Sequence, residues 1–291
     1  MRIILESIIL GILTGGVYAL MSSGLTIIYG VLDIINVAQA IFVILGAYLS
    51  YELEHYLHID IFLGLLLTIP AMFLLGMGIE RLCLRKFKEN RTMLSILVLY
   101  AVALIIQGGE NYLFTPNYIQ LQAPYSDASF PIFGFHLLYV YIFCFVLSIV
   151  LLTALYWLIY RTKFGYGLRA SMQDRTAAAL VGIDVEQIQT ITFGIGISLS
   201  AVGGLAFGIT NTFNSASSFD LISRLFVIIV LGGMGSLRGA LVASFAMLII
   251  EDVTAVVWQP VWSSTIFFML LVLLLVFRPQ GLFGLPAGRK Q

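Results

Sequence analysis

Charged residues are scarce in this chain of 291 residues. Lys, Arg, Asp and Glu together make up 10% of it, against roughly 25% in soluble globular domains, whereas apolar residues reach 60%. So few charged side chains cannot cover the surface of a water-soluble fold of this length, which argues against a soluble enzyme and a disordered chain. The 15 basic and 15 acidic residues cancel, so no net charge attracts nucleic acid. We therefore expect a lipid bilayer to surround most of the surface.

Cysteine and catalytic motifs are also lacking. The two cysteines, Cys83 and Cys144, lie far apart, whereas a disulfide framework or a zinc site needs more of them. The sequence has no G-x-x-x-x-G-K-[ST] pattern to hold nucleotide phosphates, no H-E-x-x-H and no serine elbow. We therefore expect a protein that is not an enzyme, with no metal site and no cofactor of its own.

Long apolar runs separated by short polar segments predict membrane-spanning helices, because about 20 residues cross the hydrocarbon core. A further run over 225–231 precedes the Gly-rich segment 232–236, and residues 223–235 would reach only about 20 Å as a helix. That segment is either a broken, re-entrant helix or a short crossing. The predicted fold class is all-α: one transmembrane domain, residues 1–291, with about eight spans near 8–30, 37–53, 61–79, 93–113, 137–159, 189–210, 239–257 and 263–277.

Basic residues predict the sidedness of the bundle. Five lie within 81–91, four within 161–175 and three follow the last span. The positive-inside rule places these segments, and the C-terminus, in the cytoplasm. Counting spans backwards then places the N-terminus outside. The same count requires 223–257 to be a hairpin that starts and ends outside, with its Gly-rich turn at or below the middle of the membrane.

The cytoplasmic segment 161–188 is predicted to hold a short helix. Ser171, followed three residues later by Asp174, resembles a capping box. Residues 172–181 contain an alanine run without Gly or Pro, which favours a helix. Gly182 suits the positive φ that follows a helix C-terminus. Asp184 is then predicted to cap the start of the next span.

The small apolar residues of this helix leave two interpretations open. Its patch of Ala177, Ala178, Leu180 and Val181 could dock into the groove of a partner protein. They could equally pack a connector helix on its own bundle. A helix that lies on a lipid surface would carry membrane-seeking aromatics, which are absent here.

Several motifs resemble those of a transporter family. Residues 176–182 resemble the EAA-x3-G coupling motif of ABC importer permeases, with Thr176 in place of the glutamate. Other segments resemble the branched-chain amino acid permeases, of the LivH type more than the LivM type. They are 15–31, 35–40, 45–48, 178–183, 201–208, 230–236 and 277–284. The chain departs from the pattern of that family at Gln39, where histidine is more usual, and at Asp33, where glycine is more usual.

The resemblance implies a multi-span permease subunit of an ABC importer in the plasma (inner) membrane of a prokaryote. It would translocate branched-chain amino acids inward by alternating access, with a second permease subunit, two cytoplasmic ATP-binding subunits that hold ATP and magnesium, and an extracytoplasmic solute-binding protein. Two alternatives stay open: the same permease type carrying urea, amides or other small solutes, and a stand-alone ion-coupled transporter or channel. The implied ATPase-coupling residues are Ser171, Asp174, Ala177, Ala178, Leu180 and Gly182.

The substrate path has two candidate groups. Asn36 and Gln39 form either a helix cap or a helix N-terminus that holds a substrate carboxylate, and Asp33 either pairs with an ammonium group or marks the cytoplasmic interface. The glycine-rich turn either packs tightly or lines a wet cavity; its candidate residues are Gly232, Gly233, Gly235 and Ser236. Three acidic residues near span ends are interpreted as solvated: Glu110, Glu251 and Asp252.

Overall fold

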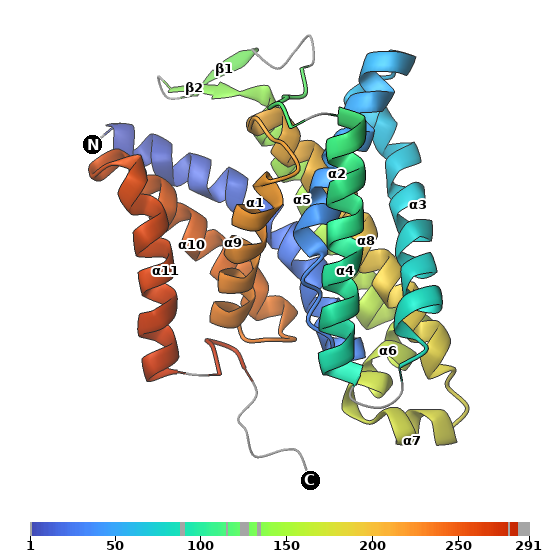
Figure 1. Cartoon of the computed structure of the whole chain (residues 1–291). Helices are drawn as coiled ribbons and strands as arrows, with labels where there is room; N and C mark the ends of the chain where they lie inside the picture. The colour runs from blue at the N-terminus through green and yellow to red at the C-terminus, as the bar shows by residue number, and fades with distance from the viewer. Residues whose placement is uncertain are drawn as a thin grey trace.

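The computed structural model describes residues 2–87, 91–114, 116–122, 128–132, 135–278 and 280–284. These residues form a helical bundle with one small β-hairpin at one end (Figure 1). The elements are α1 (Arg2–Leu32), α2 (Gln39–Leu57), α3 (Ile61–Ile79) with the π-helical turn η1 (Glu80–Leu84), α4 (Arg91–Phe114), β1 (Ser129–Ile132), β2 (Phe135–Leu138), α5 (Tyr139–Arg161), α6 (Lys163–Gln173), α7 (Arg175–Leu180), α8 (Val185–Thr210), α9 (Ser217–Gly232), α10 (Leu237–Val257) and α11 (Pro260–Phe277).

The predicted all-α polytopic bundle is confirmed. Within the described residues, seven helices are long and apolar enough to span a membrane: α1, α3 with η1, α4, α5, α8, α10 and α11. The other expected span, 37–53, is α2. Its buried first half packs inside the bundle, and its last turns carry Glu52 and Glu54, so its apolar stretch is shorter than that of the other seven.

Short polar side chains set the points at which helices begin. Asp60 caps α3, because its Oδ1 accepts a hydrogen bond from Phe62 N at 2.9 Å. Ser236 caps α10 in the same way, accepting from Gly239 N at 3.1 Å. Pro260 opens α11, where the missing N–H of proline costs no helical bond. These caps divide an otherwise continuous apolar sequence into separate helices.

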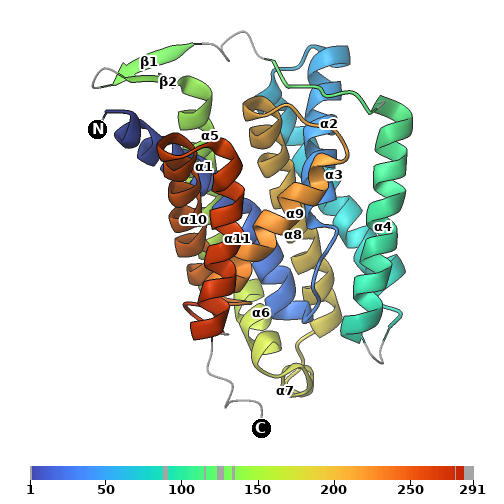
Figure 2. The same cartoon turned by 60° about the vertical axis from the view of Figure 1, so that its left-hand side comes forward.

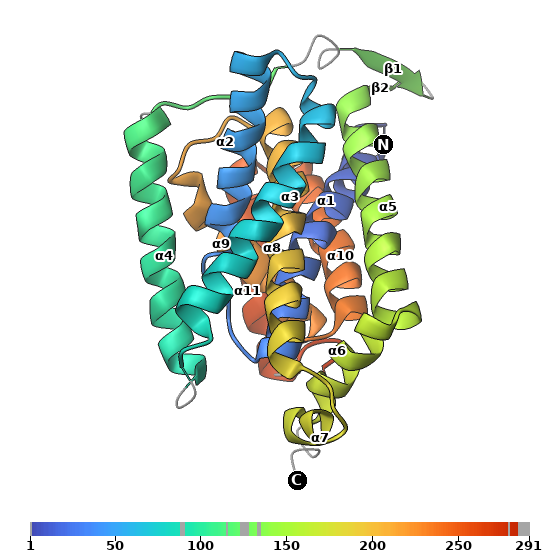
Figure 3. The same ribbon diagram turned by 90° about the vertical axis from the view of Figure 1, so that its right-hand side faces the viewer.

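Helix α8 lies at the centre of the bundle and packs against α1, α2 and α3 (Figure 3). Glycines allow the closest approaches. A Cβ at Gly11 of α1 would lie 2.6 Å from Ile249 Cα of α10, and one at Gly204 of α8 would overlap the carbonyl oxygen of Val43 in α2. These small residues therefore let the backbones of neighbouring helices pack closely.

Replacing Gly204 by alanine is expected to lower the stability of the protein by about 1–3 kcal/mol, because the backbone of α2 must move to admit the methyl group. Thermal unfolding in detergent measures the effect. Gly108→Ala is the matched control, since nothing lies within 4 Å of a Cβ at that position. Equal melting temperatures for the two variants would contradict the close α2–α8 packing.

The bundle has two distinct ends (Figures 1 and 2). Helices α6 and α7 lie at one end, and the start of α1 and the β-hairpin lie at the other. Helices α9 and α10 form the predicted hairpin, with its turn toward the α6–α7 end. Helix α9 has 16 residues and reaches about 24 Å, which is shorter than a hydrocarbon core of about 30 Å.

Candidate functional site

The segment between α5 and α8 forms two short helices rather than the one expected over 172–181. Ser171 does not open a helix: it lies within α6, and its Oγ donates to the carbonyl oxygen of Gly167 at 2.8 Å. The chain turns at Asp174, which is extended (φ −155°) and caps α7 by accepting from Thr176 N and Ala177 N at 2.8 and 3.0 Å. The predicted capping box is wrong, because Asp174 serves as an N-cap and restarts the helix.

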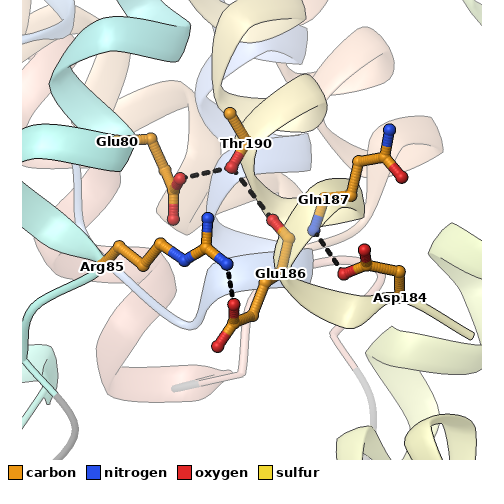
Figure 4. Close-up of polar contacts among 6 residues, drawn as sticks. All are labelled: Glu80, Arg85, Asp184, Glu186, Gln187 and Thr190. Carbon is orange, nitrogen blue, oxygen red and sulfur yellow. Dashed lines mark hydrogen bonds and ion pairs between the residues drawn. The ribbon is translucent and has the colours of Figure 1, made fainter.

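The end of α7 agrees with the sequence-based prediction. Gly182 has φ +87°, a conformation that side-chain-bearing residues rarely adopt. Asp184 caps α8, and its Oδ1 accepts from Gln187 N at 2.9 Å (Figure 4). A cap at each end thus fixes the direction in which α7 leaves the bundle.

The apolar residues of α7 and of its C-cap position, Val181, divide into two groups. Ala178 is buried, with 3% of its surface exposed, so it faces the bundle. Leu180 and Val181 are 84% and 76% exposed and project away from it. Figures 1 and 3 show α7 standing beyond the ends of the long helices. The only part of the predicted patch that a partner could contact is therefore its C-terminal end, together with Ala177.

The base of α8 is tied to η1 by a polar cluster that the sequence did not reveal (Figure 4). Arg85, at the end of η1, forms an ion pair with Glu186 in the first turn of α8. One turn further, Thr190 donates from Oγ1 to Oε2 of the fully buried Glu80 at 2.5 Å. These contacts hold the segment that connects α7 to α8 against the end of α3.

Asn36 and Gln39 are fully buried and bond within the protein. Asn36 Nδ2 donates to Gln39 Oε1 at 2.9 Å, and Gln39 Nε2 donates to Ser200 Oγ at 2.8 Å and to Gly196 O at 3.2 Å. Ala38, which makes no side-chain cap bond, occupies the N-cap position of α2. Asn36 Oδ1 accepts from Ala38 N at 3.1 Å, so Asn36 caps the turn that leads into α2. The Gln39 side chain does not complete the predicted capping box and instead joins the start of α2 to α8.

Asp33 lies apart from that amide pair. It is exposed, has φ +56°, and lines a cavity of about 660 Å³ at the α6–α7 end of the bundle. Ser171, Gly235 and Ser236 line the same cavity. The structure thus brings four of the predicted residues together, from the α1–α2 loop, α6 and the α9–α10 turn.

The other two turn glycines are packed against the end of the chain. A Cβ at Gly232 would overlap the backbone at Gly239, and one at Gly233 (φ +96°) would overlap Gly284. Leu282 N donates to Leu231 O at 2.7 Å, and Phe283 N donates to Gly232 O at 3.1 Å. The packing interpretation therefore holds for Gly232 and Gly233, whereas Gly235 and Ser236 face the cavity.

Two of the acidic residues interpreted as solvated are buried. Glu110 is 2% exposed and Glu251 is 7% exposed. Glu251 pairs with Arg224 of α9, so its charge has an internal partner. Position near a span end did not reveal the ion pair, because it depends on how α10 packs against α9.

Comparison with known proteins agrees with this architecture. The profile of the family described as "Branched-chain amino acid transport system / permease component" matches residues 7–275. The chain is 26% identical to the high-affinity branched-chain amino acid transport system permease protein BraD of Pseudomonas aeruginosa and to LivH of Escherichia coli K12, in each case over 98% of this chain and 97% of the relative. It is 25% identical to LivM of Escherichia coli K12, over 94% of this chain and 69% of the relative.

No solved structure matches the chain. The family profile covers most of the residues that form the bundle, from the first turns of α1 to the last turn of α11. The chain therefore belongs to the branched-chain amino acid ABC transporter permease family and is a multi-span membrane protein.

Proposed function

We propose that this chain is the permease subunit of an ABC importer and moves branched-chain amino acids inward by alternating access. Membership of the family supports the transport system, and the names of the BraD and LivH relatives support the substrate. The chain has no phosphate-binding loop, so the energy comes from two ATP-binding partner subunits. A second permease subunit and an extracytoplasmic solute-binding protein complete the system.

The observation that carries the proposal is the exposed end of α7. Leu180 and Val181 are large apolar side chains at the end of a helix that stands off the bundle. Their exposure to water is unfavourable, and a hydrophobic groove in an ATP-binding subunit would bury them. The caps at Asp174 and Asp184 hold α7 in a fixed orientation for that contact.

Movement of α7 can reach the large cavity through direct contacts. Arg175, the first residue of α7, donates from Nη2 to the carbonyl oxygen of Val31 at the end of α1 at 3.1 Å. Helix α6, which leads into α7, contributes Ser171 and Met172 to the cavity wall. A partner that displaces α7 would therefore shift the cavity lining between α1, α6 and the α9–α10 turn.

The sidedness follows from the basic residues of the same segment. Lys163, Arg169 and Arg175 belong to α6 and α7, so the positive-inside rule places this end in the cytoplasm. The segment after α11 lies at this end too, and the start of α1 lies at the opposite end, which the proposed sidedness assigns to the outside. The solute-binding protein then meets the end that carries the β-hairpin.

Uptake by cells from which the gene has been deleted tests the substrate. We expect uptake of radiolabelled leucine, isoleucine and valine to fall to background and to return when the gene is restored. Loss of urea or acetamide uptake with normal leucine uptake would reassign the substrate. Leucine uptake by the purified chain alone in proteoliposomes without ATP would overturn the ABC mechanism.

A further inference from the structure

A second cavity, of about 290 Å³, lies between α1, α5, α8, α9 and α10 and contains charged residues. Ser7 near the start of α1 and Asn211 at the end of α8 line it, which places it toward the end opposite α6 and α7. Arg224 of α9 donates from Nη1 to Oε1 of Glu251 in α10 at 2.7 Å. Asp252 lines the same wall. One cation and two carboxylates thus face a single space.

These charges lie within apolar helices, where ionisable groups are costly and usually mark a substrate path. The Arg224 and Glu251 side chains are 31% and 8% exposed. Glu251 Oε2 is buried and has no hydrogen-bond partner among the described residues. The ion pair between α9 and α10 uses one carboxylate, whereas Asp252 accepts a hydrogen bond from Thr14 Oγ1 at 3.5 Å and has no cationic partner among the described residues. The additional carboxylate gives the wall an affinity for a cationic group.

The guanidinium can also bind a second anion without losing its ion pair. A guanidinium carries five N–H donors in a planar fork that matches a carboxylate. The bond to Glu251 uses Nη1, and a side-chain hydrogen bond to Tyr18 uses a further donor, so some of the five donors remain. Because almost a third of the Arg224 side chain is exposed, its remaining surface is accessible to a ligand carboxylate.

A small apolar recess of about 40 Å³ adjoins this cavity. Thr14, Tyr18 and Tyr141 line both spaces, so the two are neighbours. The remaining walls of the recess are mainly apolar and include Leu13, Met21, Cys144 and Phe207. The combined space therefore has a charged end and an apolar end.

We propose that this combined space binds a free amino acid as a zwitterion. Its carboxylate lies against Arg224, its ammonium group lies between Asp252 and Glu251 Oε2, and its aliphatic side chain points along the apolar wall toward the recess, which admits only its tip. The proposal rests on the proposed function and extends it by naming the residues that select the substrate class. An uncharged solute such as urea would leave the carboxylates of the wall without a cation.

Ligand analogues test each charge separately. Leucinamide lacks the carboxylate of leucine, and 4-methylpentanoate lacks its ammonium group. We expect the full-length chain in lipid nanodiscs to bind leucine roughly 30-fold or more tightly than either analogue, as measured by competition with radiolabelled leucine. Arg224→Gln should remove the preference over leucinamide and keep part of that over 4-methylpentanoate. Asp252→Asn should produce the opposite pattern.

Controls separate recognition from folding. Asp220→Asn removes a charge from α9 one turn before Arg224, at an exposed position, and should leave both preferences unchanged. Arg224→Lys keeps a cation beside Glu251 and should retain more of the preference over leucinamide than Arg224→Gln does. General unfolding would weaken the binding of all three ligands. It would not make each variant lose the preference for leucine over a different analogue.

Two results would overturn the inference. If Arg224→Gln and Asp252→Asn both keep the preferences of the unmodified chain, the amino acid binds elsewhere, and the proposed function stands. If the unmodified chain does not distinguish leucine from its analogues, the cavity is not a zwitterion site. The uptake experiment with deleted cells then decides separately whether branched-chain amino acids are the substrate.

Discussion

Replacing Leu180 and Val181 together by glutamate is expected to abolish co-purification of the ATP-binding subunits and to reduce leucine uptake to background. Both side chains are exposed at the end of α7, so the folded bundle tolerates the change. In the complex the two carboxylates would be buried in an apolar groove without partners, which costs several kcal/mol. Affinity for the ATP-binding subunits should fall at least about 100-fold, as measured by pull-down from membranes.

A matched control lies on the same helix. Thr176 occupies the position at which the related coupling motif has glutamate, so Thr176→Glu adds a negative charge where the motif accepts one. We expect this variant to retain its partners. Ala178→Glu would not serve as a test, because Ala178 is buried against the bundle and the substitution would perturb the fold itself. Unchanged co-purification of the Leu180/Val181 variant would show that the partners bind elsewhere.

Replacing Gln39 by leucine is expected to destabilise the protein by about 2–4 kcal/mol. The change leaves the Asn36 amide without its acceptor and Ser200 without its donor, in a region that no solvent reaches. Each buried polar group without a partner costs about 1–3 kcal/mol. The melting temperature of the purified chain in detergent should fall accordingly.

The same substitution at an exposed glutamine provides the control. Gln187→Leu should leave the melting temperature unchanged, because only the backbone N–H of Gln187 makes a described bond to the Asp184 cap. A Gln39→Leu variant with the melting temperature of the unmodified protein but an altered KM for leucine uptake would contradict the structural role of Gln39. It would instead support the earlier prediction that Gln39 lines the substrate path.

Local features of the fold could be predicted from the sequence. Apolar runs of sufficient length located the spans, and the asymmetry of basic residues required the α9–α10 hairpin. Gly182 and Asp184 were identified because positive φ and side-chain capping depend on a few neighbouring residues. Ser171 and Asp174 are both possible N-cap residues within one turn, and their spacing alone did not decide which of them would begin the helix.

Contacts between distant segments could not be predicted. The Asn36–Gln39 pair bonds to Ser200, on a helix that only the folded bundle brings beside α2. The Arg224–Glu251 pair depends on the register of α9 against α10, which the predicted hairpin did not define. Polar residues that bond internally have the same sequence signature as residues that await a ligand. The residues predicted to line the substrate path therefore fall into separate groups: the amides of Asn36 and Gln39 are buried and bond internally, whereas Asp33, Gly235 and Ser236 line a cavity.

The bonds from Leu282 and Phe283 to the α9–α10 turn have a consequence for biogenesis. The carbonyl oxygens of Leu231 and Gly232 receive these donors from residues that the ribosome adds about fifty positions later, after α11. The hairpin can therefore enter the bilayer during translation, but its turn is completed only once synthesis has passed the last helix. A nascent chain truncated before residue 282 would expose an open turn, a feature by which quality-control proteases could distinguish unfinished from finished molecules.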